Sequence, residues 1–455
     1  MSFLAYLFAA APFVIVLLLA LGLVFLTVTS TINAWVPLVL LYLVLVIDTA
    51  SLHSTALNLG LLVYPADLVA AVFFFAFLYR VLALGKGELV PRAWWVLGSV
   101  QLGLFVWGLI QNGTGAGVDY RQHFYVWIGA AYLATFEYDA ARAQRFVKWL
   151  LPLAIALSCV AIYRWAIGAM DWQFQRELDR LITTGVSFRV IWAAPTFMIA
   201  MAMLVAIYYA MTVREKFGYW FWALTFGMMV LVLQHRSVWV AALGGVGVLL
   251  FLLTRYQAGK VGKLLFLGCA LLAIVAIGLT SLKGVSESVQ VQSSRAFSTT
   301  EGTFAGRVSG WQSLLNDWLN SGSPAMYLVG KPFGSGYSRY SSNFGGHEIG
   351  YVPHNYYVHL LYRGGLVGML CFLWVVWFGV RAIWARVKQG DDFAPLQLAM
   401  TIALLVYYIP YGVAYDQVLI MGLLLSAIVP SREVARRPHL SQSAPSGREV
   451  QCSRM

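Results

Sequence analysis

The run PHNYYVHLLYRGGLVGML, residues 353–370, places a histidine where an apolar helix is expected to begin. Pro353 followed by His354 and Asn355 is typical of the N-terminal edge of such a helix. The imidazole of His354 can take a proton from a hydroxyl group near neutral pH, which is the task of a general base. His354 is therefore a candidate catalytic base. The simpler alternative is a solvated histidine with no chemical role.

Two glycines share a helical face with this histidine. Val358, Leu361, Gly365 and Gly368 follow His354 at spacings of four, seven, eleven and fourteen residues, close to one face. Glycines at such positions let another helix approach closely. A metal site is a weaker hypothesis, because the nearby ligand-type residues lack the His-Glu-x-x-His spacing: His347, Glu348, His354 and His359. We expect no metal and no cofactor.

Two arginines occupy positions that suit the binding of a phosphate oxyanion. Arg236 lies in MMVLVLQHRSVWVAALGGV, which turns between two apolar helices with almost no loop. Arg307 is expected in the first turn of an amphipathic helix over 305–320, in which one face carries Val308, Trp311, Leu315 and Trp318. A guanidinium binds oxyanions bidentately, and a helix N-terminus adds free amides. The alternatives are nonspecific contact of Arg236 with lipid phosphate and a surface helix end for Arg307.

Residues 330–350, GKPFGSGYSRYSSNFGGHEIG, are rich in glycine and aromatic residues. A nucleotide loop is excluded, because the Gly-x-Gly-x-x-Gly pattern fails after Gly336 and no helix-opening lysine follows. In a flexible loop, exposed Tyr337 and Tyr340 could instead clasp a sugar through ring stacking and hydroxyl contacts. A disordered connector is the alternative.

The amino-acid composition indicates a membrane protein, so we expect membrane-spanning helices to position the candidate residues named above. The chain has 455 residues, of which 60% are hydrophobic and 11% charged, whereas a soluble domain is nearer half apolar and a quarter charged. Disordered, collagen-like and disulfide-stapled classes are excluded as well. We expect an all-α polytopic transmembrane bundle of 12 or 13 spans, the count depending on the short run 35–47. The candidate spans are 3–28, 35–47, 59–80, 94–110, 123–137, 147–169, 189–212, 219–234, 237–253, 262–280, 355–380, 396–410 and 415–430.

The net charge of +12 is attributed to topology, and no nucleic-acid partner is expected. Most of the 31 Lys and Arg residues fall in alternate loops and in the tail, which the positive-inside rule assigns to the cytoplasm. The chain then divides into an N-terminal bundle, 1–280, an external loop, 281–353, C-terminal helices, 354–430, and a disordered cytoplasmic tail, 431–455. The side on which the N-terminus lies depends on whether 35–47 spans.

Taken in order, these motifs resemble those of the bacterial O-antigen ligase and O-antigen or exopolysaccharide polymerase superfamily. The family has His-Asn followed by Gly-x-x-Gly, an arginine at the outer end of an earlier span, and an arginine before a tryptophan in the loop. The matching positions here are His354, Asn355, Gly365, Gly368, Arg236 and Arg307, and SFRVIWAAPTFMIA adds Arg189.

The resemblance implies a C-type membrane glycosyltransferase of the inner membrane, with a periplasmic active site and no nucleotide sugar or metal. The donor would be a glycan on undecaprenyl pyrophosphate, and the acceptor lipid A-core or another lipid-linked glycan, both within membrane lipids. Arg236 and Arg307, with Arg189, would stabilise the pyrophosphate. His354 would deprotonate the acceptor hydroxyl, and Asn355 would orient groups nearby.

Two alternatives stay open at this point. A ligase and a polymerase differ in acceptor, and Met369 and Leu370 after the second motif glycine slightly favour a polymerase, since ligases often have small hydroxyl residues there. A polytopic lipid or sugar transporter or flippase would also carry charge in its spans. It should show acidic or broken midplane helices in paired positions rather than functional residues gathered at one face.

Overall fold

The computed structural model describes residues 21–51, 55–58, 62–137, 139–168, 190–213, 217–256, 303–341, 347–350 and 353–429. Within these ranges the chain is almost entirely helical, and two short antiparallel hairpins supply the strands. The expected all-α class is confirmed to that extent. The expected span 262–280, the tail 431–455 and Arg189 lie outside the described residues.

The first half of the described chain, after helical residues 21–32, contains six α-helices, a 3-10 turn and one hairpin. These elements are α2 (Trp35–Ala50), β1 (Leu57–Asn58), β2 (Leu62–Val63), α3 (Pro65–Leu82), η1 (Lys86–Leu89), α4 (Arg92–Asn112), α5 (Gly115–Ala134), α6 (Ala140–Lys148) and α7 (Leu150–Ala166).

The second half adds the remaining helices and the second hairpin. These elements are α9 (Ala193–Thr212), α10 (Phe217–Val232), α11 (Arg236–Tyr256), α14 (Thr303–Leu319), α15 (Pro324–Val329), β3 (Ser338–Ser341), β4 (His347–Gly350), α16 (Tyr356–Lys388), α17 (Ala394–Tyr407), η4 (Tyr415–Gln417) and α18 (Val418–Ile428). The hairpin pairs Tyr340 with Glu348.

Six helices in the described ranges are long and apolar enough to cross a membrane: α3, α4, the joined α6 and α7, α9, α11 and α16. Five shorter apolar helices accompany them, among them residues 35–50, where the expected span was shortest. The set is consistent with a multi-pass membrane protein. α5 is 20 residues long but carries Asp119, Arg121 and His123 in its first half, and it is not among the six.

α9 and α5 each pack against several other helices of the bundle. α9 is buried along nearly its whole length and packs against α7, α10, α11 and α17. α5 packs against α3, α4 and α18, and α16 lies against α4, α17 and α18. Leu133 of α5 and Gly422 of α18 show how close the second group lies, because a Cβ at Gly422 would come within 2.6 Å of the leucine side chain. The C-terminal half of α5, from Tyr125 to Ala134, is therefore largely enclosed by protein.

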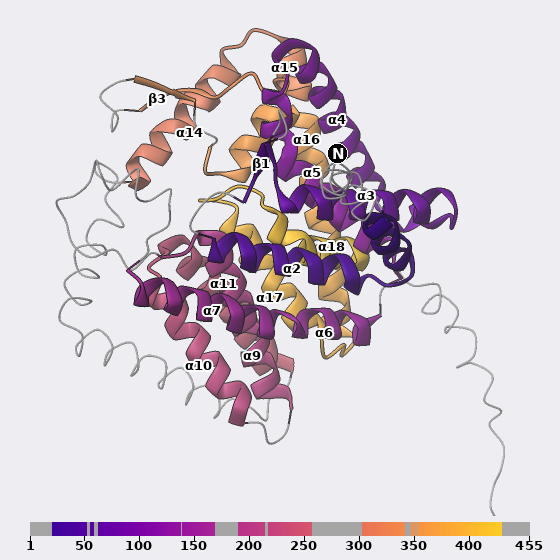
Figure 1. Cartoon of the computed structure of the whole chain (residues 1–455), viewed down its shortest axis with the longest axis vertical. Coiled ribbons are helices and arrows are strands. Elements are labelled where there is room, and N and C mark those ends of the chain that lie inside the picture. Colours follow the sequence, from indigo (N-terminus) through magenta and orange to yellow (C-terminus); the bar gives the residue numbers. More distant parts are fainter. Residues whose placement is uncertain are drawn as a thin grey trace, which may run out of the picture.

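The two ends of the bundle differ in chemistry. At the loop-bearing end, α14, α15 and β3 gather together (Figure 1), and residues 332–337 contact the end of α4 and the start of α5. At the opposite, basic end, Arg80 donates to Thr135 Oγ1 over 2.7 Å, and Lys86 pairs with Glu137 at 3.2 Å. The ends of α6, α11 and α16 that carry Lys148, Arg255 and Lys388 complete the basic end.

α16 is broken at Gly365, whose φ of 57° and ψ of −160° are not helical. A Cβ there would lie 2.4 Å from the carbonyl carbon and oxygen of Leu328, at the end of α15. Gly368 has ordinary space instead, with its nearest neighbours, Leu360 and Leu97, at 3.7 Å. Of the two motif glycines expected to admit a neighbouring helix, only Gly365 is approached closely.

We predict that Gly365→Ala lowers the free energy of unfolding by about 2–4 kcal/mol, because it adds both backbone strain and a clash. Gly368→Ala is the matched control, and it should be neutral or slightly stabilising, since alanine favours helix more than glycine does. Denaturant titration of the purified proteins in detergent measures both. Equal effects of the two substitutions would show that the break is not a structural requirement.

Candidate functional site

His354 and Asn355 lie immediately before α16, at the loop-bearing end. Asn355 has an extended backbone and caps the helix: its Oδ1 accepts a hydrogen bond from Val358 N–H at 3.0 Å. The cap explains why the helix begins at Tyr356. This oxygen of Asn355, which we expected to orient substrate groups, is therefore occupied by the backbone. His354 is half-buried, and its ring centroid lies 6.3 Å from that of Tyr411.

Arg307 reaches the same tyrosine from a different part of the chain. Its Nη1 donates to Pro410 O over 3.3 Å, and its guanidinium carbon lies 5.1 Å from the Tyr411 ring centroid. α14 begins at Thr303, so Arg307 lies in its second turn rather than its first. The structure thus brings two of the three expected catalytic residues, His354 and Arg307, to one aromatic side chain.

The segment after α17 is a rigid support for this meeting point. Tyr411 stacks on Tyr407, with ring centroids 4.8 Å apart, and Tyr407 stacks in turn on Phe197 of α9 at 4.2 Å. The amide of Tyr356 donates to Tyr408 O over 2.9 Å and to Tyr411 O over 3.0 Å. The first residue of α16 is therefore tied to the same segment that Arg307 contacts.

Arg236 is the first residue of α11, after a turn of three residues from the end of α10, as the sequence predicts. The buried ring of His235 holds this turn, with its Nε2 2.8 Å from Ile191 O, and Gln234 has a φ of 56°. α11 runs antiparallel to α17, because it begins beside Ile191 at the start of α9, and Phe197 near that same start stacks on Tyr407 at the end of α17. Arg236 is therefore at the loop-bearing end, toward the segment that contains Tyr411.

Tyr337 and Tyr340, the two tyrosines expected to bind sugar in a flexible loop, both lie in ordered structure. Tyr337 is only 3% exposed, so the prediction of an exposed stacking residue is wrong for it. Tyr340 lies in β3, paired with Glu348, where a flexible loop was expected. Burial of Tyr337 follows from the glycines around it: a Cβ at Gly334 would lie 2.6 Å from the amide nitrogen of Ala116, at the start of α5.

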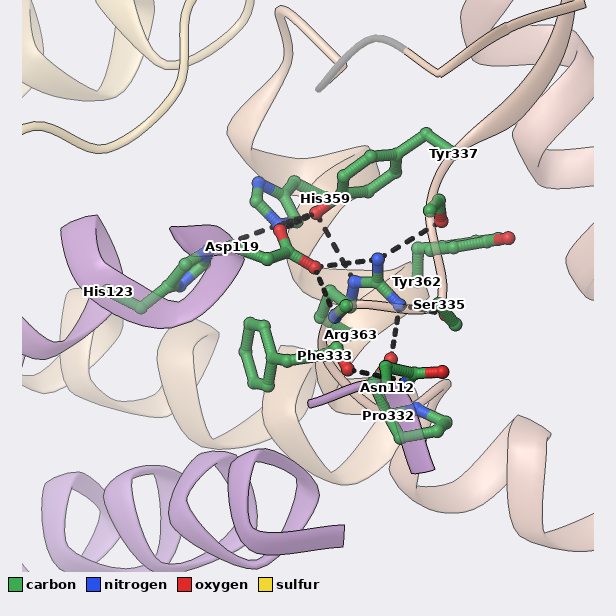
Figure 2. Close-up of polar contacts among 12 residues, drawn as sticks. Asn112, Asp119, His123, Pro332, Phe333, Ser335, Tyr337, His359, Tyr362 and Arg363 are labelled. Carbon is green, nitrogen blue, oxygen red and sulfur yellow. Dashed lines mark hydrogen bonds and ion pairs between the residues drawn. The ribbon is translucent and has the colours of Figure 1, made fainter. Parts of the chain in front are cut away.

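The hydroxyl of Tyr337 belongs to a buried polar network between the loop and two helices (Figure 2). Asp119 of α5 accepts hydrogen bonds from this hydroxyl and from Gly334 N–H, the latter over 3.0 Å. It also forms an ion pair with Arg363 of α16 at 2.7 Å. Arg363 is 0% exposed, and Asp119 is its ion-pair partner within the described part of the chain.

Other N–H groups of the Arg363 guanidinium donate hydrogen bonds to acceptors in the loop. Its Nη1 donates to Pro332 O and to Ser335 Oγ, each over 2.6 Å, and its Nη2 donates to Gly336 O over 3.1 Å. A guanidinium has five N–H groups in a fixed plane, and these acceptors surround it. The loop segment 332–336 is thus held against α16 by the cation itself.

Hydrogen-bond roles in the network follow from the number of protons available. Burial raises the pKa of Tyr337 well above its usual range. Its hydroxyl therefore stays protonated and donates a hydrogen bond to Asp119. The oxygen of Tyr337 must then accept from His359 Nε2, 2.7 Å away. His359 Nε2 also faces His123 Nε2 at 3.2 Å, and His123 Nδ1 contacts Gln101. The network therefore joins α4, α5 and α16 to the loop.

Asp119, His123 and Arg363 were not predicted from the sequence, where His359 was noted only as a poor metal ligand. A usable signal was present, because two pairs of ionisable residues stand four apart inside apolar helices: Asp119 with His123, and His359 with Arg363. Among the described residues, no group of three or more His, Cys, Asp or Glu side chains could hold a metal ion.

Comparison of the chain with protein-family models and with curated proteins gives no match.

We predict strong coupling between Arg363 and Asp119. Arg363→Met should lower the free energy of unfolding by about 3–5 kcal/mol, because it leaves a buried carboxylate unpaired. The double variant Arg363→Met, Asp119→Leu should lose about 1–3 kcal/mol less unfolding free energy than the two single variants lose together. A double-mutant cycle of denaturant titrations measures this, and additive losses would mean that the two side chains do not interact.

Proposed function

We propose that the chain is a membrane glycosyltransferase that moves a glycan from undecaprenyl pyrophosphate to a sugar hydroxyl at the periplasmic face of the inner membrane. This is the activity of the O-antigen ligase and polymerase superfamily, which the ordered motifs resemble. The observation that carries the proposal is the meeting of His354 and Arg307 at Tyr411, from segments that are far apart in the sequence.

The distribution of charge supports a periplasmic site. Lys148, Arg255 and Lys388 mark the basic end of the bundle, opposite His354 and Arg307. By the positive-inside rule the basic end faces the cytoplasm and the loop-bearing end faces the periplasm. Lipid-linked glycans that have been flipped to the outer leaflet would then present their pyrophosphate at the depth of the arginines.

The reaction needs a base and a cationic site for the leaving group, and the proposed residues supply both. The acceptor oxygen attacks the anomeric carbon while its proton moves to His354. The bond from that carbon to the pyrophosphate oxygen breaks on the opposite face, and the pyrophosphate leaves with the electron pair. Arg307 and Arg236 stabilise its growing charge, and Arg189 is proposed to assist. His354 then returns the proton to water.

The finer architecture belongs to the same proposal. The long and short apolar helices, with α5 and the span expected at 262–280, give 12 or 13 crossings of a C-type bundle, the count depending on residues 35–47. Residues 281–353 then form the periplasmic loop that contains α14, α15 and the β3–β4 hairpin. Residues 354–430 complete the bundle, and 431–455 form a cytoplasmic tail.

The acceptor is either lipid A-core, for a ligase, or a second lipid-linked glycan, for a polymerase. Deletion of the gene separates the two by the surface polysaccharide that results. Loss of a ligase leaves long polymer on the carrier lipid, whereas loss of a polymerase leaves at most one repeat on the surface.

We predict that His354→Ala lowers the transfer rate by about 10²–10⁴-fold and Arg307→Ala by about 10²–10³-fold, with membrane insertion unchanged. Purified protein, lipid-linked donor and acceptor in liposomes, followed on gels, give the rates. Arg121→Ala is the control, since Arg121 lies at the same end of the bundle but pairs with Asp67 at 3.2 Å. Wild-type activity in either test variant would contradict the proposed mechanism. A wild-type protein without transferase activity would instead favour a transporter.

We also predict that the transfer rate is unchanged by a chelator of divalent metal ions. The proposed site neutralises pyrophosphate with arginines, which are always charged, rather than with Mg²⁺ or Mn²⁺. The assay is the same liposome reaction with and without EDTA. A rate that collapses with EDTA and returns with added metal would show that the arginines are not sufficient.

A further inference from the structure

We propose that Tyr337 is a positioning residue that sets the separation between Arg307 and His354. The inference rests on the proposed function, because it assigns Tyr337 a role in that same reaction. Tyr337 need not contact either residue directly for this role. It acts through the two helices that carry them, and its ring and its hydroxyl each make one part of the connection.

The ring of Tyr337 lies in a small apolar cluster that joins α14 to α16. The buried members are Leu314, Trp318, Met326, Tyr337, Val358 and Tyr362. Leu314 follows Arg307 by two helical turns, and Val358 follows His354 by about one turn. The packing of this cluster therefore determines how far apart the two functional side chains lie.

Apolar contacts alone leave the two helices free to slide, because the hydrophobic effect has no direction. The hydroxyl of Tyr337 supplies the direction. It bonds to Asp119 of α5, to His359 Nε2 at 2.7 Å and to Arg363 Nε at 3.2 Å. Hydrogen bonds to charged groups inside a low-dielectric interior are strong and geometrically strict. The hydroxyl thus fixes the ring, and with it the cluster, relative to α5 and α16.

A second link between α14 and α16 is weaker. Asp317 accepts from Tyr362 over 2.8 Å and pairs with Lys331 at 2.6 Å, but its side chain is 39% exposed. Water screens such contacts, and they contribute little to rigidity. Arg363 holds residues 332–336 against α16, and the buried hydroxyl of Tyr337 adds a directional connection from the apolar cluster to α5 and α16.

The break at Gly365 makes this connection necessary. Residues 356–364 form a separate segment of α16, so the rest of that helix does not set their direction. On the loop side, Lys331 N–H donates to Tyr362 O over 2.8 Å, next to the break. The segment that follows His354 is thus held by the loop and by the Tyr337 network rather than by a continuous helix.

The test is Tyr337→Phe, which keeps the ring in the cluster and removes only the hydroxyl. We expect kcat for glycan transfer to fall about 10–100-fold while KM changes less than about threefold, since a misplacement of about 1 Å can cost that much rate. The matched control is Tyr327→Phe, packed against the same cluster, whose hydroxyl donates to Leu319 O at the end of α14. The control should keep kcat within about twofold.

Hydrogen exchange gives a readout that does not depend on activity. In Tyr337→Phe the amides of residues 356–364 should exchange faster than in the wild type, and in Tyr327→Phe they should not. Wild-type kcat together with wild-type exchange in Tyr337→Phe would overturn the positioning role. If the wild-type protein shows no transfer at all, the proposed function fails, and the exchange comparison still decides whether Tyr337 holds this segment.

Ser335→Ala provides a milder variant, should Tyr337→Phe fail to fold. It removes one 2.6 Å hydrogen bond to Arg363 from the same network. We expect kcat to fall several-fold with KM unchanged, and an unchanged kcat in a folded Ser335→Ala protein would overturn the proposal.

Discussion

Arg363 carries a positive charge into the interior of the bundle just before the break in α16. A buried guanidinium is tolerated only with an anion and hydrogen-bond acceptors around it. Asp119 of α5 supplies the anion, and residues 332–336 of the loop supply the acceptors. Because those acceptors belong to the loop, the charge is satisfied only when the loop is docked on the helices. Burial of this arginine and docking of the loop therefore depend on each other.

The position of the candidate site follows from this docking. The docked loop holds α14, which carries Arg307, and it borders the first turns of α16, which His354 precedes. Both side chains then meet at Tyr411, whose segment is stacked on Tyr407 and tied to the amide of Tyr356. Three parts of the chain thus form one surface. Rigid placement of this kind is what the proposed transfer between two substrates requires.

Much of the fold was accessible from local sequence patterns, whereas the network was not. Apolar runs predict the long helices, the amphipathic stretch after Arg307 predicts α14, and the short turn before Arg236 is where it was expected. The pairing of Asp119 with Arg363 joins positions far apart in the chain, and local periodicity carries no information about such partners. Tyr337 was misread because glycine-rich flanks suggest an exposed loop. Here the glycines admit backbone contact with α5 and α16.

The central claim is that His354 acts as a base on the acceptor while arginines stabilise the leaving pyrophosphate, without a covalent glycosyl intermediate. The stereochemistry of the product tests it most directly. The anomeric configuration of the newly formed linkage can be determined by NMR and compared with that of the pyrophosphate-linked sugar in the donor. A single direct displacement predicts inversion. Retention of configuration would require a nucleophile on the protein and would contradict the account.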